Sequence, residues 1–255
     1  MTTDTSLALL LASPRLWLAI VVGTAVLLLA GCAAWRVEQA RSLARASEPY
    51  RQAGEAGAPR LLVVGDSTAV GTGATAPDFS VAGRIGARFP AATIDNRARD
   101  GATWADVPGQ LGGAPGAGYD IALLMAGGND VIRLRDMAAV RADIERSIAL
   151  ARERAATVVV MPAGNVGNAP FFWAPLSWWM TSRARDLHAA VAAACQAQGA
   201  VYVNLFREAE DDPFAQRRDL HAADGLHPSD AGYALWWETL DTQAALTQRL
   251  QAAGR

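Results

Sequence analysis

Short apolar runs alternate with longer segments of helical pattern from residue 60 to the C-terminus, and this alternation restricts the fold more than any other feature. The apolar runs are Leu61–Val64, Ala92–Ile94, Ile121–Met125, Thr157–Met161 and Ala200–Leu205. Strands that alternate with helices predict a mostly parallel sheet with helices on both faces. Because parallel strands are joined by right-handed crossovers, their carboxyl ends gather at one edge. We therefore expect an α/β domain with its functional groups at that edge.

The clearest helical segments are Asp136–Arg154, Trp178–Gln198 and Ser229–Gln251. They separate or follow the predicted strands, as crossover helices do. His188 stands beside Arg and Asp residues in the second of these segments, which is typical of a solvated helix face. We expect no functional role for it.

Composition excludes several classes of function. Of the 255 residues, 51% are hydrophobic and 19% are charged, as in a well-packed globular protein, and the net charge of −2 gives no reason to expect a nucleic-acid partner. All basic residues are Arg, which excludes a Schiff-base lysine and a P-loop. Three His and two Cys form no metal-ligand pattern. We expect no metal and no cofactor, and the sequence leaves the oligomeric state open.

The N-terminus has the pattern of a membrane segment. Leu16–Trp35 carries no charged residue and lies between Arg15 and Arg36. Twenty helical residues span about 30 Å, the thickness of the hydrocarbon core of a bilayer. Residues 1–35 are therefore predicted to be a transmembrane helix or a lipoprotein-type signal, and the protein to be membrane-anchored in a bacterial cell envelope.

Two anchoring routes remain open. Leu29-Ala30-Gly31-Cys32 resembles the lipobox of bacterial lipoproteins, in which signal cleavage is followed by lipidation of the Cys, here Cys32. Several Arg residues follow the apolar stretch and only Arg15 precedes it. For a retained helix this asymmetry favours a cytoplasmic domain. Whether the domain lies in the cytoplasm or faces the periplasm stays undecided.

The composition changes again between the apolar stretch and the first predicted strand. Residues 36–59 are rich in Arg, Ala, Glu and Gly and end in Gly54-Glu55-Ala56-Gly57-Ala58-Pro59. The first half is able to continue the helix out of the membrane, and the second half has the composition of a tether. We expect a linker at 36–59 and one globular domain at 60–255.

Polar motifs follow the predicted strands. Gly65-Asp66-Ser67 comes directly after the first apolar run, and Gly127-Gly128-Asn129-Asp130 follows the third. Near the C-terminus, Asp224-Gly225-Leu226-His227-Pro228 supplies a base and a carboxylate in one short loop. Each motif alone has an ordinary structural interpretation, because Ser caps helices and Asn occupies turns. Together at one sheet edge they indicate a serine nucleophile with a histidine base.

The order of these motifs resembles that of the SGNH (GDSL-like) hydrolase family, whose four blocks contribute Ser, Gly, Asn and His. The second block, an Asn followed five residues later by Gly, matches Asn96 and Gly101. Thr68 stands where the name-giving motif has Leu. The resemblance covers the chain from about Arg60 onward. It implies a three-layer, flavodoxin-like α/β/α fold with a central five-stranded parallel sheet.

The resemblance also implies a function. Ser67 would be the nucleophile, His227 the general base and Asp224 the residue that orients it, while the backbone N–H groups of Ser67 and Gly101 and the side chain of Asn129 would form the oxyanion hole. The implied activity is hydrolysis of carboxylic esters through an acyl-serine, on lipids, lysolipids or other acyl esters. An O-acetyltransferase or carbohydrate deacetylase of the same fold, and a non-catalytic envelope binding protein, are the alternatives.

An aromatic segment follows the fourth predicted strand. Residues 170–180 contain Phe171, Phe172, Trp173, Trp178 and Trp179. Such a segment is able to line an acyl-binding wall or to enter the interface of the membrane. It is equally able to pack in the core. Phe171, Trp173, Trp178 and Trp179 are the candidate substrate-binding residues.

Overall fold

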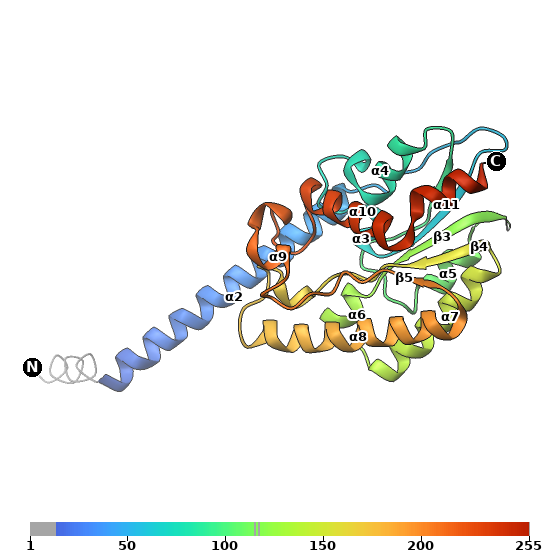
Figure 1. Ribbon diagram of the computed structural model, residues 1–255. Helices are drawn as coiled ribbons and strands as arrows, with labels where there is room; N and C mark the ends of the chain where they lie inside the picture. The colour runs from blue at the N-terminus through green and yellow to red at the C-terminus, as the bar shows by residue number, and fades with distance from the viewer. Residues whose placement is uncertain (1–13, 115, 117, 255) are drawn as a thin grey trace, which may run out of the picture.

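The computed structural model describes residues 14–114, 116 and 118–254. Five parallel strands form one sheet in the order β2-β1-β3-β4-β5, which confirms the predicted α/β architecture (Figure 1). The strands are β1 (Arg60–Gly65), β2 (Thr93–Asn96), β3 (Tyr119–Met125), β4 (Ala155–Val160) and β5 (Val201–Tyr202). The helices used below are α2 (Pro14–Ala46), α3 (Ser67–Val70), α4 (Val81–Arg88), α5 (Val107–Gly112), α6 (Gly128–Ile132), α7 (Met137–Arg152), α8 (Leu176–Gln198), α10 (Asp230–Ala244) and α11 (Leu246–Ala253).

Helices cover both faces of the sheet, because alternate strand residues point to opposite sides. In β1, Leu62 and Val64 pack with residues of α5, α7 and α8. Leu61 and Val63 pack on the other side with residues of α4, α10 and α11. All four of these side chains are fully buried. The near-continuous apolar runs of the sequence therefore correspond to strands that are covered on both faces.

The strand order places a crevice beside β1. The chain passes from β1 to β2 on one side and later to β3 on the other side, so the direction of winding reverses between β1 and β3. Open α/β sheets bind ligands at the carboxyl ends of the strands at such a point. Gly65 closes β1 at this position with φ +145°, and a Cβ there would lie 1.8 Å from the carbonyl oxygen of Met125. Only glycine allows the two strand ends to approach so closely.

Two predicted elements differ from the structure. The last helix does not run unbroken over Ser229–Gln251, because Ala245 has φ +49° and separates α10 from α11. The Asp241 carboxylate accepts hydrogen bonds from the backbone N–H and the hydroxyl of Thr247, which replaces helical bonding at the break. The fifth strand is also shorter than Ala200–Leu205, since it pairs only with β4 over Val201–Tyr202.

The N-terminal helix α2 extends away from the domain over its apolar half (Figure 1). It is 33 residues long, with a mean hydropathy of 2.4 in its most apolar window, so it is long and apolar enough to be a membrane anchor or a signal sequence. At 1.5 Å per residue it measures roughly 50 Å. The polar half beyond Arg36 lies against the domain.

Residues 47–59 are attached to the domain. Gln52 forms an antiparallel bridge with Ile94 of β2, and its side-chain amide donates to the carbonyl oxygens of Phe89 and Ala92. The Arg51 guanidinium donates to the carbonyl oxygen of Asn96 at 3.0 Å. These contacts hold the predicted tether along the edge of the sheet.

Candidate active site

Ser67 occupies the first turn of α3, directly after β1. The preceding Asp66 caps this short helix, because its Oδ1 accepts from the backbone N–H and the hydroxyl of Thr68 at 2.9 and 2.7 Å. The side chain of Gln110 in α5 forms two hydrogen bonds with Gly65 at the end of β1. Its Oε1 accepts from the N–H of Gly65, and its Nε2 donates to the carbonyl oxygen of Gly65. The hydroxyl of Ser67 is thereby carried by a fixed turn at the sheet edge.

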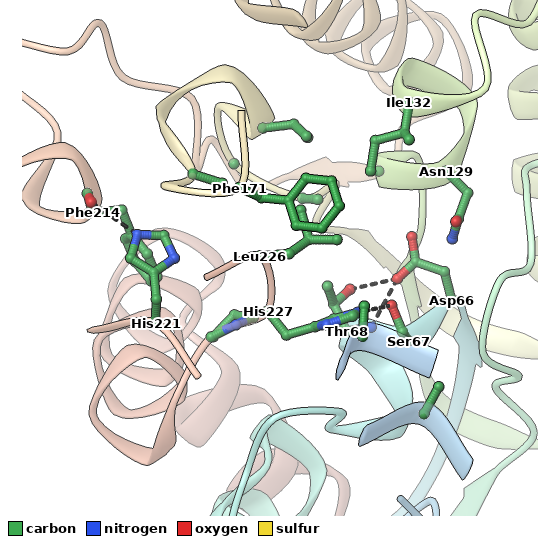
Figure 2. A pocket seen from close by; sticks show the side chains of 18 of the residues that line it. Asp66, Ser67, Thr68, Asn129, Ile132, Phe171, Phe214, His221, Leu226 and His227 are labelled. Carbon is green, nitrogen blue, oxygen red and sulfur yellow. Dashed lines mark hydrogen bonds between the residues drawn. The ribbon is translucent and has the colours of Figure 1, made fainter. Parts of the chain in front are cut away.

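A chain of hydrogen bonds joins Asp224, His227 and Ser67. The Oδ2 of Asp224 lies 2.6 Å from Nδ1 of His227. On the other side of the ring, Nε2 of His227 lies 2.9 Å from Oγ of Ser67; Figure 2 shows these two residues beside the cavity. Oδ1 of Asp224 accepts from the backbone N–H groups of Leu226 and His227. This geometry brings Ser67 to a histidine 160 positions further along the chain, and Asp224 precedes that histidine by three positions.

The charge of Asp224 is stabilised where it is needed. Burial by itself would raise the pKa of this carboxyl, but the hydrogen bonds and positive charge of His227, together with the two backbone N–H groups, hold the pKa below its usual value. An ionised Asp224 accepts a hydrogen bond from Nδ1–H of His227, and this tautomer leaves Nε2 unprotonated toward Ser67. The arrangement is therefore able to remove the proton of the Ser67 hydroxyl.

Two further groups face the same edge. Gly101 has φ +73°, a conformation that favours glycine. The side-chain Nδ2 of Asn129 donates to the carbonyl oxygen of Ala102 at 3.0 Å, which uses one of its two hydrogens. Both Gly101 and Asn129 line the same cavity as Ser67. The structure thus gathers the residues of the four sequence blocks, with buried Asn96 bonded to the carbonyl of Ala69 behind α3.

Asp130 fixes the relative positions of these groups. It is fully buried and accepts from Nη1 of Arg135 at 2.8 Å and from the backbone N–H of Trp104 at 3.1 Å. Trp104 lies in the loop that begins at Gly101, while Asp130 follows Asn129 in α6. One carboxylate therefore links the two loops that carry Gly101 and Asn129.

A cavity of about 290 Å³ opens above Ser67 and His227. Figure 2 shows Phe171, Leu226 and Ile132 on the side opposite the Ser67 hydroxyl. Other apolar lining residues are Val166, Ala169, Leu205, Phe214 and Trp236, and the polar half of α2 contributes Val37, Ala40, Arg41 and Ala44. The lining beyond the reactive groups is mainly apolar.

The candidate aromatic residues separate into two groups. Phe171 lines the cavity. Trp173, Trp178 and Trp179 are not among its lining residues and are 46%, 71% and 51% exposed.

The two remaining histidines also differ from expectation. His188 is buried, not solvated, because its face of α8 packs on the sheet and its ring bonds Tyr202 and Ala163.

His221 matches none of the four sequence blocks, yet it lines the cavity. Its Nε2 donates to the carbonyl of Phe214 at 2.9 Å, and its buried Nδ1 has no partner. Gln110 and the α2 residues were missed as well. None of these residues belongs to one of the four sequence blocks. The only signal in the sequence is position, because Gln110 follows the second block and His221 precedes the fourth.

Asp66 is an unusual buried carboxylate beside Ser67. It is 1% exposed, and its Oδ2 has no hydrogen-bond partner. Burial raises the pKa of Asp66 to about 6, although the Thr68 hydrogen bonds oppose the shift. The folded protein therefore holds this proton more tightly than the unfolded chain does. The contribution of Asp66 to stability is present below about pH 4 and is lost as the pH rises through 6.

Asp66→Asn is expected to stabilise the protein at pH 8 but not at pH 4, because the amide removes the cost of a buried charge. The gain should be on the order of 1–3 kcal/mol in the free energy of unfolding, or several degrees in Tm. Thermal unfolding of the full chain in detergent from pH 4 to 8 measures it. The exposed Asp219→Asn serves as the control and should show no such gain. A difference in Tm between Asp66→Asn and the wild type that stays constant from pH 4 to pH 8 would contradict the assignment of a raised pKa to Asp66.

Known proteins resemble this chain in sequence or in fold. The family model for GDSL-like lipases and acylhydrolases matches residues 63–235. The GDSL-like esterase Rv1075c of Mycobacterium tuberculosis is 31% identical over 200 residues, which cover 74% of this chain and 63% of that protein. An extracellular lipase from Streptomyces rimosus superposes with a TM-score of 0.58 at 20% identity, covering 73% of this chain and 100% of the lipase. A phospholipase A1 from Streptomyces albidoflavus NA297 gives 0.56 at 18% identity, covering 73% and 99%.

The five-stranded parallel sheet with these blocks at its carboxyl edge is the fold of the SGNH hydrolases. The chain belongs to the GDSL-like lipase/acylhydrolase family. Lipases and acylhydrolases make up this family.

Proposed function

We propose that the protein hydrolyses carboxylic esters through an acyl-Ser67 intermediate. His227 accepts the Ser67 proton at Nε2 while Oγ bonds to the acyl carbon. The tetrahedral intermediate then collapses, the ester C–O bond breaks, and His227 returns the proton to the departing alcohol. Water attacks the acyl-Ser67 with His227 again as base, which releases the carboxylic acid and restores the serine.

One observation carries this proposal: the hydrogen-bonded sequence from Asp224 through His227 to Ser67, with the Ser67 hydroxyl at the floor of a cavity. The oxyanion of the tetrahedral intermediate would be bound by the N–H groups of Ser67 and Gly101 and by the second hydrogen of the Asn129 amide. Donors of this kind each contribute about 2.7–4 kcal/mol to catalysis.

The cavity favours an acyl chain longer than acetyl. Its apolar lining extends beyond the reactive groups through Phe171, Leu226 and Ile132. Burying each methylene of a substrate against such a surface contributes about 0.8 kcal/mol. This supports an esterase or lipase-like activity over deacetylation of a carbohydrate.

Covalent labelling tests the nucleophile. A fluorophosphonate probe should label the full-length protein in detergent, and mass spectrometry should locate the adduct on Ser67. Ser67→Ala should abolish the labelling. Folded wild-type protein that resists the probe would instead favour a non-catalytic binding protein.

A further inference from the structure

The anchor helix α2 contributes one wall of the active-site cavity. Four of its residues line the cavity: Val37, Ala40, Arg41 and Ala44. Their spacing of three, one and three positions places them on one helical face. All four lie beyond the apolar half of the helix, in the polar continuation that runs against the domain. The helix is thus part of the site as well as a tether.

Specific contacts hold this helix at the mouth of the cavity. Nη1 of Arg36 donates to the carbonyl oxygens of Pro170 and Phe171 at 2.6 and 3.0 Å. The same guanidinium stacks on Trp173, 4.7 Å from the ring centroid. Because Phe171 lines the cavity, these contacts link the end of the apolar half directly to the cavity wall.

The position of Arg36 in the sequence also indicates where the membrane surface lies relative to the domain. Arg36 is the first charged residue after the apolar stretch Leu16–Trp35, so it marks the point where the chain leaves the hydrocarbon. Lipidation at Cys32 would give the same level, since four helical residues span about 6 Å. Both anchoring routes therefore bring the cavity mouth to the membrane surface.

Exposed apolar side chains follow Phe171 in the chain. Trp173, Leu176, Trp178 and Trp179 are between 43% and 71% exposed. They occupy the segment around the first turn of α8, at the end of the domain nearest the apolar half of α2 (Figure 1). Tryptophan side chains are favoured at the interface between bilayer and water. The exposed rings therefore fit a lipid surface rather than water.

We infer that the cavity takes long-chain acyl glycerolipids directly from the membrane leaflet next to the domain, with residues 37–44 forming one wall of the acyl site and residues 173–179 seated in the lipid interface. The inference rests on the proposed ester hydrolysis and names its substrate class. It makes the anchor helix a determinant of substrate specificity.

Two matched substitutions in α2 test the wall. Ala40→Trp fills the cavity from the helix side, whereas Ser42→Trp places the same ring on an exposed position outside it. The assay uses the full chain in phosphatidylcholine vesicles and compares kcat/KM for p-nitrophenyl decanoate with kcat/KM for p-nitrophenyl acetate. Ala40→Trp should lower the ratio of decanoate to acetate at least about tenfold, because roughly two methylenes of the decanoyl chain would no longer be buried. Ser42→Trp should leave the ratio within twofold. Equal ratios in both variants would contradict the proposal that residues 37–44 form a wall of the acyl site.

The lipid interface has its own test. The double variant Trp178→Ser/Trp179→Ser should lower hydrolysis of a fluorescent diacylglycerolipid in the bilayer several-fold relative to hydrolysis of soluble p-nitrophenyl acetate. Phe79→Ser, which removes an exposed aromatic ring outside the segment, is the control. An unchanged ratio in the double variant would overturn the seating of residues 173–179 in lipid.

A readout without turnover separates this inference from the proposed function. The full-length Ser67→Ala variant in vesicles that contain phosphatidylcholine with a diazirine-bearing acyl chain should, on irradiation, become crosslinked at peptides containing Phe171 and Leu226. Adding Ala40→Trp should remove these crosslinks. Crosslinks confined to residues 16–35 would overturn the lipid site even if esters are hydrolysed. Cavity crosslinks in a protein that hydrolyses no ester would instead overturn the proposed function alone.

Discussion

Ser67→Ala is expected to lower kcat/KM for p-nitrophenyl esters on the order of 10⁶-fold, the largest effect of any single substitution in this chain. The methyl group cannot bond to the acyl carbon, and the remaining groups give only the residual rate that oxyanion stabilisation and binding provide. Steady-state hydrolysis by the purified full chain in detergent measures the loss.

The control for this substitution is Ser80→Ala. Ser80 is also a buried serine at the start of a helix, and its Oγ accepts from the backbone N–H of Gly83 as the cap of α4. Losing this cap should cost about 1 kcal/mol of stability and leave the rate at 25 °C near that of the wild type. Substantial hydrolysis by a folded Ser67→Ala variant would reject Ser67 as the nucleophile.

Asp224→Asn should lower kcat about 10⁴-fold through the tautomer of His227. The backbone N–H groups of Leu226 and His227 donate to Oδ1 of Asp224, so the amide oxygen of the new Asn keeps that position. Its NH₂ group then faces Nδ1 of His227. Nδ1 must accept this hydrogen bond, so the neutral ring carries its proton on Nε2 and cannot take the proton of Ser67.

Two measurements distinguish this mechanism from misfolding. Thermal unfolding of Asp224→Asn should stay close to that of the wild type, because the substitution keeps the shape and both backbone bonds. Fluorophosphonate labelling of Ser67 should slow in parallel with ester hydrolysis, since both need the same base. A loss smaller than about tenfold in kcat would show that Asp224 does not set the His227 tautomer.

The parallel sheet could be predicted because its strands are covered on both faces. Leu61–Val64 and Ile121–Met125 are continuous apolar runs, and the observed strands extend them by one or two residues at an end. Prediction was less successful where local and tertiary preferences differ. The edge strand β5 pairs with β4 over two residues only, although the apolar run is longer. The break at Ala245 is accompanied by a hydrogen bond from Thr247 to Asp241, which the periodicity of the sequence does not predict.

The candidate site divides in the same way. The blocks at Ser67, Gly101, Asn129 and His227 could be identified because each follows a strand or sits in a short motif with its own order. The environment of those residues could not. The motif Gly65-Asp66-Ser67 does not indicate the environment of Asp66, and only the packing around it reveals an unpartnered oxygen and a raised pKa. His188 has charged sequence neighbours but faces the sheet.

The sequence by itself determined the α/β sheet, the long apolar helix and the motifs that meet at the carboxyl edge of the sheet, because apolar runs and short motifs are local properties of the chain. Only the tertiary structure decided which residues surround the Ser67 hydroxyl. The wall formed by residues 37–44 comes from a helix that matches no family block, and three of the four candidate aromatic residues lie outside the cavity. Such placement depends on how elements distant in sequence pack together, and burial in that packing is a collective property of the fold.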